Sequence, residues 1–121
     1  MKKRFSVVIV HRNGADMLLN TLSALTRAWD ATRDELFLVD NASTDDSLER
    51  VEAAFPQTII IRNRCNNGFA RANNQAIARA TGEFVLLLNS DAVMAADVLD
   101  RFEADFRRDP RIGVIAGQLQ D

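Results

Sequence analysis

The sequence predicts an α/β fold in which a mainly parallel, Rossmann-like sheet carries helices on both faces, within one domain spanning residues 1–121. Short apolar runs rich in β-branched residues recur along the chain, and apolar stripes at helical spacing fill the gaps between them. The runs are almost continuously apolar, which is typical of strands covered on both faces. Strict alternation of strand and helix with short connections is typical of a parallel sheet.

The predicted elements follow one another in a regular order. The strands are the apolar runs Phe5–Val10, Glu35–Val39, Thr58–Ile61, Phe84–Leu88 and Ile112–Ala116. The helices are indicated by four stripes, namely Leu18, Leu22, Leu25 and Trp29; Leu48, Val51 and Phe55; Ala72, Ala76, Ile77 and Ala80; and Val98, Leu99, Phe102 and Phe106. Right-handed crossovers predict the order 3-2-1-4 for the first four strands.

Three helix ends carry sequence signals. The segment Ser43–Asp46 has the pattern of a capping box for the second helix, with Asp in place of Glu. Gly82 is predicted to end the third helix, and Pro110 to close the fourth.

Composition excludes several classes of function. Hydrophobic residues make up 47% of the chain and the net charge is −2, which is ordinary for a globular protein and argues against a nucleic-acid partner. Cys65 is the only cysteine, so no intrachain disulfide can form, and we expect a reducing, cytoplasmic location. The longest apolar run, Phe84–Leu88, is far too short to cross a bilayer.

Ligands of such sheets bind beyond the carboxyl ends of the strands, where the strand order reverses. This rule selects four polar segments as the candidate site: His11–Gly14, Asp40–Ser43, Asn63–Gly68 and Asn89–Asp91.

Asn89–Asp91 leaves a hydrophobic strand with an amide, a hydroxyl and a carboxylate in succession. Oxygen ligands of this kind suit Mg²⁺ or Mn²⁺ that carries a substrate diphosphate. An ordinary turn, in which Asp91 caps the next helix, explains the same residues equally well.

The other candidate residues also have two interpretations. Asp40 can accept a hydrogen bond from a pyrimidine ring N–H, but the residues alone favour support of the loop at Ser43. Gly68 suits a turn with positive φ, or a close approach of the backbone to a base or phosphate. The lone histidine, His11, is a base, a ligand or a polar loop contact. Asn74 lies within a predicted helix, although asparagine is a poor helix former, and this suggests that its side chain bonds to a neighbouring loop.

Other nucleotide-related folds lack their signatures in this chain. No G-x-G-x-x-G follows the first strand, and no G-K-[ST] occurs. A phosphoryl-receiver domain would need acidic residues after the first strand, an Asp after the third and a late Lys. The chain has His11-Arg12 and Arg62-Asn63 at the first two places, and no lysine beyond Lys3.

Taken together, the loops resemble those of family 2 glycosyltransferases of the GT-A fold, in the form of rhamnosyltransferase-like members. The matching segments are Ser6–Gly14, Leu38–Asp45, Asn67–Asn74 and Leu87–Asp91. His11 and Arg12 depart from the family, which commonly has Thr or Asn and then Tyr. Asn89 replaces the first acid of the D-x-D metal motif, as it does in the rhamnosyltransferase-like members.

The resemblance implies an inverting transfer of sugar from a UDP- or dTDP-linked donor to a glycan or lipid-linked acceptor in cell-surface polysaccharide biosynthesis. Asp91 would hold Mn²⁺ or Mg²⁺ and the diphosphate, and Asp40 would recognise the pyrimidine. The residues expected to bind the donor are His11, Asn13, Asp40, Asn41, Gly68, Asn74, Asn89, Ser90 and Asp91.

Five expectations accompany this assignment. The chain is the nucleotide-binding portion of a longer enzyme, its catalytic base lies beyond residue 121, and this portion alone transfers no sugar. The full enzyme is cytoplasmic, or peripheral at the inner face of the membrane. The exposed face of the sheet forms a homodimer. The alternatives are a non-catalytic nucleotide-binding module and a receiver-like signalling domain.

Overall fold

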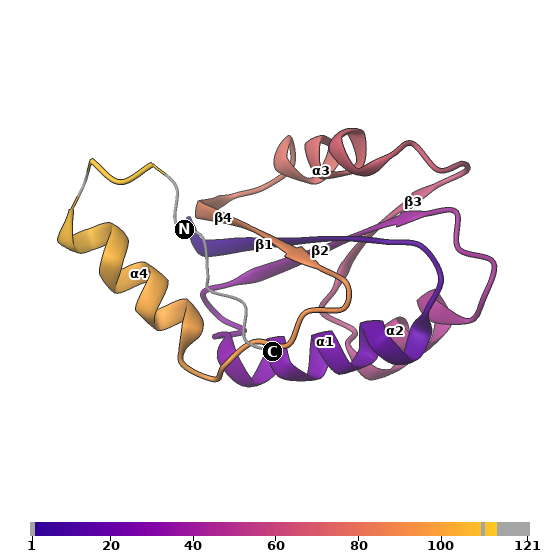
Figure 1. Ribbon diagram of the computed structural model, residues 1–121, viewed down its shortest axis with the longest axis horizontal. Coiled ribbons are helices and arrows are strands. Elements are labelled where there is room, and N and C mark those ends of the chain that lie inside the picture. Colours follow the sequence, from indigo (N-terminus) through magenta and orange to yellow (C-terminus); the bar gives the residue numbers. More distant parts are fainter. Residues whose placement is uncertain (1, 110, 114–121) are drawn as a thin grey trace.

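The computed structural model describes residues 2–109 and 111–113. Strands and helices alternate along this part of the chain (Figure 1). The elements are β1 (Lys3–His11), α1 (Ala15–Ala28), β2 (Glu35–Asn41), α2 (Ser47–Ala54), β3 (Ile59–Asn63), α3 (Phe69–Ile77), β4 (Gly82–Asn89) and α4 (Val98–Arg108). The predicted α/β architecture is therefore confirmed.

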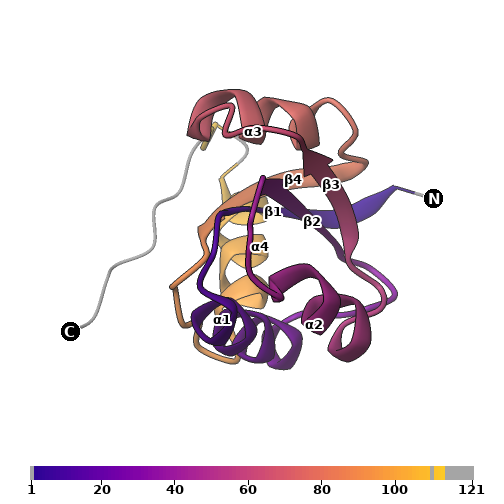
Figure 2. The ribbon, with the colours of Figure 1, turned by 90° about the vertical axis from the view of Figure 1, so that its right-hand side faces the viewer.

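The four strands form one parallel sheet in the order β3-β2-β1-β4, as predicted. The connections through α1 and α2 step across the sheet in one direction, so right-handed crossovers place both helices on the same face. The connection through α3 steps back past β2 and β1, and the same handedness places α3 on the opposite face (Figure 2). Strand order thus reverses between β1 and β4.

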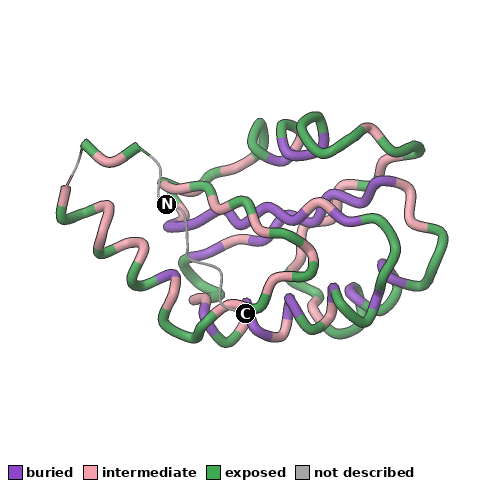
Figure 3. The backbone as a smooth tube through the Cα atoms, viewed as in Figure 1, coloured by how far each residue is buried: buried purple, intermediate pink, exposed green. Residues whose placement is uncertain are grey.

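Each face of the sheet packs its own apolar cluster. The larger cluster joins β1 and β2 to α1, α2 and α4, with Leu18, Leu22 and Leu99 fully buried. The smaller cluster places Ala72 and Ala76 of α3 against the sheet. Burial is consequently concentrated along the two central strands (Figure 3).

β4 is covered on one face only. Phe84, Leu86 and Leu88 pack against the larger cluster, whereas Val85 and Leu87 are 44% and 49% exposed. The prediction that every apolar run is covered on both faces is wrong here within the described part of the chain, because α3 packs mainly against β1 and β2 and also contacts β3 through Asn63.

The strands continue beyond the apolar runs that predicted them. His11, Asp40, Asn41 and Asn89 are the last residues of their strands and do not belong to the loops that follow. The backbone ladder does not require apolar side chains, so a strand ends where its pairing ends. For the predicted fifth strand, residues 112 and 113 lie outside any strand, and residues 114–116 lie outside the described residues.

Two predicted helix signals are wrong. α2 begins at Ser47 after Asp46, and no side-chain hydrogen bond caps it. α3 ends at Ile77, and Gly82 is the first residue of β4. Within the described part of the chain, every helix falls short of the length and apolar character that crossing a membrane requires.

β4 approaches β1 closely at Gly82. A Cβ atom at this position would lie 2.5 Å from the backbone nitrogen of Ser6 and 2.7 Å from its Oγ. The Gly82 N–H donates to Ser6 Oγ at 2.8 Å, and that hydroxyl donates to Glu35 Oε2 at 2.6 Å. A glycine is needed here by a tertiary contact between strands.

We expect Gly82→Ala to lower the free energy of unfolding by about 1–3 kcal/mol, the usual cost of overpacking, because the methyl group meets backbone atoms. Denaturant unfolding measures the change. Gly113→Ala is the matched control, since no atom lies within 4 Å of a Cβ placed there. Equal stability of the two variants would contradict the close approach of the strands.

Candidate functional site

The carboxyl ends of four parallel strands meet at one edge of the sheet. His11 of β1 lies opposite Asp40 of β2, and Asn41 of β2 lies opposite Asn63 of β3. Asn89 of β4 lies opposite Val10, the residue before His11 on β1. Most of the predicted donor-binding residues lie at these strand ends or in the loops that follow them. Asp40 and Asp91 therefore lie at the same edge.

Alternation along the strands divides this edge into two sides. His11 contacts Ser47 of α2, which places His11 and its register partner Asp40 on the side of α1 and α2. Asn63 contacts Gln75 of α3, which places the Asn41–Asn63 pair on the opposite side. Successive side chains of a strand point to opposite faces, so Asp40 and Asn41 face different surroundings.

The first and second loops are joined by reciprocal hydrogen bonds. Asn13 Oδ1 accepts from the backbone N–H groups of Thr44 at 2.8 Å and Asp45 at 3.3 Å. In return, the Asn13 N–H donates to Ser43 Oγ and the Gly14 N–H donates to Asp45 Oδ2, both at 2.8 Å. Asn13 and Gly14 have positive φ values of 55° and 95°. These bonds hold a backbone conformation that L-residues rarely adopt.

His11 is 2% exposed, and its ring belongs to the buried part of this network. Nε2 lies 3.0 Å from Ser47 Oγ, and the Ser47 hydroxyl donates to Asp45 Oδ1. Because the only hydroxyl proton of Ser47 is used in that bond, Nε2 is the protonated nitrogen and donates to Ser47. Nδ1 has no partner among the described residues.

Burial lowers the pKa of His11 below its ordinary value, and the nearby charges of Asp40 and Asp45 offset this only in part. The imidazole is therefore neutral at pH 7. The Ser47 hydroxyl and backbone N–H, with the Gly14 N–H, outweigh desolvation and lower the pKa of Asp45 to about 2. His11 thus serves as a buried contact between β1 and α2 in this structure.

The Asp40 carboxylate accepts two hydrogen bonds from Ser43, in the loop that follows β2. Oδ1 accepts from Ser43 Oγ at 2.6 Å, Oδ2 accepts from the Ser43 N–H at 3.0 Å, and the residue is 3% exposed. The loop needs such support because Ala42 has a positive φ of 64°. The geometry therefore favours the interpretation in which Asp40 supports the loop.

On the side of the sheet that faces α3, three amide side chains are linked in a row by hydrogen bonds. Asn63 Nδ2 donates to Asn41 Oδ1 at 2.9 Å, and Asn63 and Gln75 exchange hydrogen bonds of 2.8 and 2.9 Å. Asn41 Nδ2 donates to the Gly68 carbonyl at 3.3 Å. The predicted side-chain bond from Asn74 to a neighbouring loop is absent among the described residues, where Asn74 is exposed, and Gln75 of the same helix bonds instead to Asn63 of β3.

Asn89–Asp91 ends β4 in a turn, closed by a 3.1 Å hydrogen bond from the Ala92 N–H to the Asn89 carbonyl. Asp91 is exposed, and its carboxylate has no hydrogen bond or ion pair within residues 2–109 and 111–113. The interpretation of Asp91 as the cap of the next helix is wrong, since α4 begins at Val98 after Asp97.

Among the residues described, no group of three or more His, Cys, Asp or Glu side chains could hold a metal ion. Mg²⁺ is commonly bound by one or two carboxylates together with substrate phosphates and water. The single free carboxylate of Asp91, with the side-chain oxygens of Asn89 and Ser90 in the same turn, fits an ion of this kind that arrives with a diphosphate.

Three arginines at this edge were not among the residues predicted to bind the donor, although Arg12 and Arg64 lie within the predicted polar segments. Arg12 follows β1, Arg64 follows β3 and Arg71 lies in the first turn of α3; all three are exposed. None forms an ion pair with another described residue, unlike Arg50 or Arg62. For Arg12 and Arg64, the position directly after a strand is the sequence signal that could have identified them.

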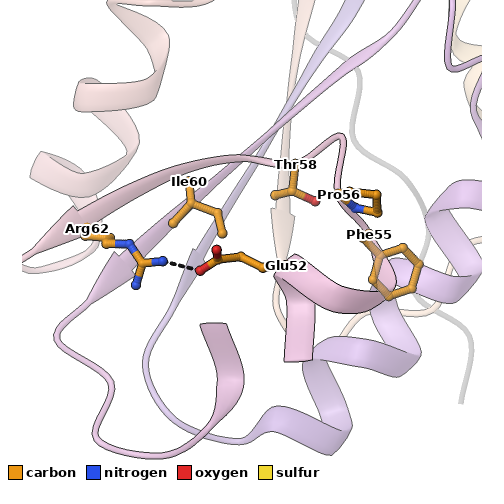
Figure 4. Close-up of a pocket in the computed structure, with 6 residues that line it drawn as sticks. All are labelled: Glu52, Phe55, Pro56, Thr58, Ile60 and Arg62. Carbon is orange, nitrogen blue, oxygen red and sulfur yellow. Dashed lines mark hydrogen bonds and ion pairs between the residues drawn. The ribbon is translucent and has the colours of Figure 1, made fainter. Parts of the chain in front are cut away.

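A separate hollow of about 270 Å³ lies between α2 and the edge strand β3 (Figure 4). Apolar side chains and the Glu52–Arg62 ion pair line it. None of the predicted site residues contributes to it, so it is distinct from the carboxyl edge.

Solved structures share this fold and carry nucleotide ligands. Staphylococcus aureus TarS 1–349, in complex with UDP-GlcNAc, superposes with a TM-score of 0.81 at 28% identity, over 87% of this chain and 31% of its own. The mannosyltransferase PcManGT of Pyrobaculum calidifontis, in complex with GDP-Man and Mn²⁺, gives a TM-score of 0.73 at 27% identity, over 82% and 31%.

Sequence comparison finds similar proteins. YfnE of Bacillus subtilis (strain 168), an uncharacterised glycosyltransferase, is 33% identical over 78% of this chain and 24% of its own length. A poly(ribitol-phosphate) β-glucosyltransferase of Bacillus spizizenii is 28% identical over 97% and 19%. The chain spans less than a third of each of these proteins. The sequence model described as Glycosyl transferase family 2 matches residues 6–120, nearly the whole chain, and the chain therefore belongs to that family.

Proposed function

We propose that this chain binds the nucleotide-sugar donor of a glycosyltransferase, with the diphosphate at the carboxyl edge between β1 and β4. The observation that carries the proposal is the turn at the end of β4, where Asp91 presents a carboxylate without a partner among the described residues. This turn lies at the point where the strand order reverses, which is where open parallel sheets bind ligands. The UDP-GlcNAc complex of TarS supports the class of ligand.

Asp91 is the residue proposed to hold Mn²⁺ or Mg²⁺. The ion would neutralise charge that develops on the departing diphosphate. Asn89 carries no charge, so its proposed part is a contact to ribose or phosphate, with Ser90 beside it. The Mn²⁺ complex of the mannosyltransferase supports a metal in this fold.

Positive charge around the edge fits the same ligand. Arg12, Arg64 and Arg71 are exposed and lie in loops or a first helical turn at the carboxyl edge. A diphosphate approaching this edge meets guanidinium groups that form no ion pair within residues 2–109 and 111–113, and guanidinium groups bind phosphate oxygens in a bidentate manner. These arginines are proposed to draw the diphosphate toward Asp91.

Base recognition is proposed for the side of the edge that faces α3. The Asn41 amide there retains one donor and one acceptor beyond its bonds to Asn63 and Gly68, a pair that matches the N–H and carbonyl of a pyrimidine. A base-reading role for Asp40 stays a prediction that the bonds to Ser43 oppose. His11, Asn13 and Asn74 would then shape the loops around the donor.

The reaction proposed for the full enzyme is an inverting transfer to a glycan or lipid-linked acceptor at the cell surface. Relatives named for such polymers support this, including a poly-β-1,6-N-acetyl-D-glucosamine synthase of Staphylococcus aureus that is 26% identical. His11, the neutral imidazole, is buried against α2 and cannot reach an acceptor in this structure. We propose that this chain supplies donor binding and that a residue outside it deprotonates the acceptor.

Asp91→Ala should abolish the dependence of UDP binding on Mn²⁺, because no other described carboxylate lies in the turn. Isothermal calorimetry with and without Mn²⁺ measures this. Asn89→Ala, the control in the same turn, should weaken binding about 2–10-fold, the range for a neutral hydrogen bond, and should keep the Mn²⁺ effect. If the unaltered chain bound UDP with the same affinity in the presence and absence of Mn²⁺, the metal assignment would be contradicted.

Asp40→Asn and Ser43→Ala should both weaken UDP binding and lower the free energy of unfolding by about 1.5–3 kcal/mol, because both remove the charge-assisted bond from Ser43 Oγ to Asp40 Oδ1. The loss of stability in the double variant should be smaller than the sum of the two single losses, since the two residues share that bond. If Asp40→Asn abolished UDP binding while Ser43→Ala kept it, Asp40 would be the base-reading residue.

A further inference from the structure

We propose that Thr21 of α1 is a positioning residue for Asp91, and that it acts through the backbone of the preceding residue. The Thr21 hydroxyl donates to the Ser90 carbonyl oxygen at 2.8 Å, across 69 positions of sequence. This inference rests on the proposed function of Asp91, because it assigns to Thr21 the orientation of the carboxylate that is proposed to meet the metal.

The bond acts on Asp91 through the planarity of the peptide unit. Ser90 and Asp91 are the two central residues of the turn that the Ala92-to-Asn89 hydrogen bond closes. The Ser90 carbonyl and the Asp91 nitrogen belong to one rigid plane. Holding the carbonyl oxygen restrains that plane, and together with the turn-closing bond of the Ala92 N–H it restrains the direction in which the Asp91 side chain leaves the backbone.

Few other contacts restrain this turn. Within the residues that the structure describes, the Thr21 contact is the only hydrogen bond that joins the segment 90–96 to the chain before β4. Met94 packs against the larger core cluster further along, but Val93 is exposed. The orientation of Asp91 therefore depends strongly on one hydroxyl group.

Thr21 is suited to this part because its helix is rigidly packed. The residue is 1% exposed and lies beside Leu22, and both Leu18 and Leu25 of the same helix are fully buried. Its hydroxyl has one proton and two acceptors within reach, Ser90 O and the Met17 carbonyl at 3.1 Å in its own helix. The shorter distance favours the bond to Ser90.

The experiment compares Thr21→Val, which keeps the shape and removes the hydroxyl, with Thr21→Ser, which keeps the hydroxyl. Thr26→Val is the matched control, because the Thr26 hydroxyl bonds only within α1, to the Ser23 carbonyl at 3.1 Å. Calorimetry gives UDP affinity with and without Mn²⁺, and amide exchange of Ala92 reports the order of the turn. Thermal unfolding checks that each variant is folded.

Thr21→Val should weaken Mn²⁺-dependent UDP binding about 2–10-fold, the effect of one hydrogen bond, weaken metal-free binding by a smaller factor and accelerate Ala92 exchange. Thr21→Ser should restore the unaltered behaviour, and Thr26→Val should show none of these effects. If Thr21→Val bound UDP like the unaltered chain, or if Thr26→Val lost as much UDP affinity as Thr21→Val, this inference would be overturned while the proposed function would stand. An unaltered chain without any Mn²⁺ effect overturns the proposed function and this inference with it.

Discussion

The pairing of β4 with β1 is the constraint on which the rest of this molecule depends. Because β3 returns through α3 across the far face of the sheet, the Asn89–Asp91 turn lies one strand away from the loop that follows His11. The approach is close enough to require glycine at position 82, where the N–H bonds to the Ser6 hydroxyl. Had β4 paired with β3 instead, the turn would lie at the far edge of the sheet, away from the first loop.

The carboxyl edge combines a scaffold with groups left free. On the side of α1 and α2, His11, Asp40 and Asp45 are engaged with Ser43 and Ser47 and hold two loops in conformations with positive φ. At the end of β4, by contrast, the Asp91 carboxylate has no partner among the described residues. Polar groups that are already satisfied support a site, whereas unsatisfied exposed ones are available to a ligand. This difference explains why Asp91 is the stronger candidate for donor binding and Asp40 the stronger candidate for loop support.

The sequence predicted the parallel sheet, its strand order and the four helices, because these follow from alternation and crossover handedness. It failed at positions where tertiary contacts decide. Gly82 resembled a helix stop, but glycine is needed there because Ser6, which is distant in sequence, leaves no room for a Cβ atom. The Asn63–Gln75 amide pair and the Thr21–Ser90 bond also join residues whose spacing carries no periodic signal. The rhamnosyltransferase-like subtype, the homodimer and the location stay predictions.

The most direct test of the account is a nuclear magnetic resonance titration of the 121-residue chain with UDP and Mg²⁺, followed by traces of paramagnetic Mn²⁺. The account predicts amide shift changes at the carboxyl edge, in residues 12–14, 63–68 and 89–92, and selective Mn²⁺ broadening around Asp91. Changes confined to the hollow beside Glu52 and Arg62, with Asp91 unaffected, would contradict it.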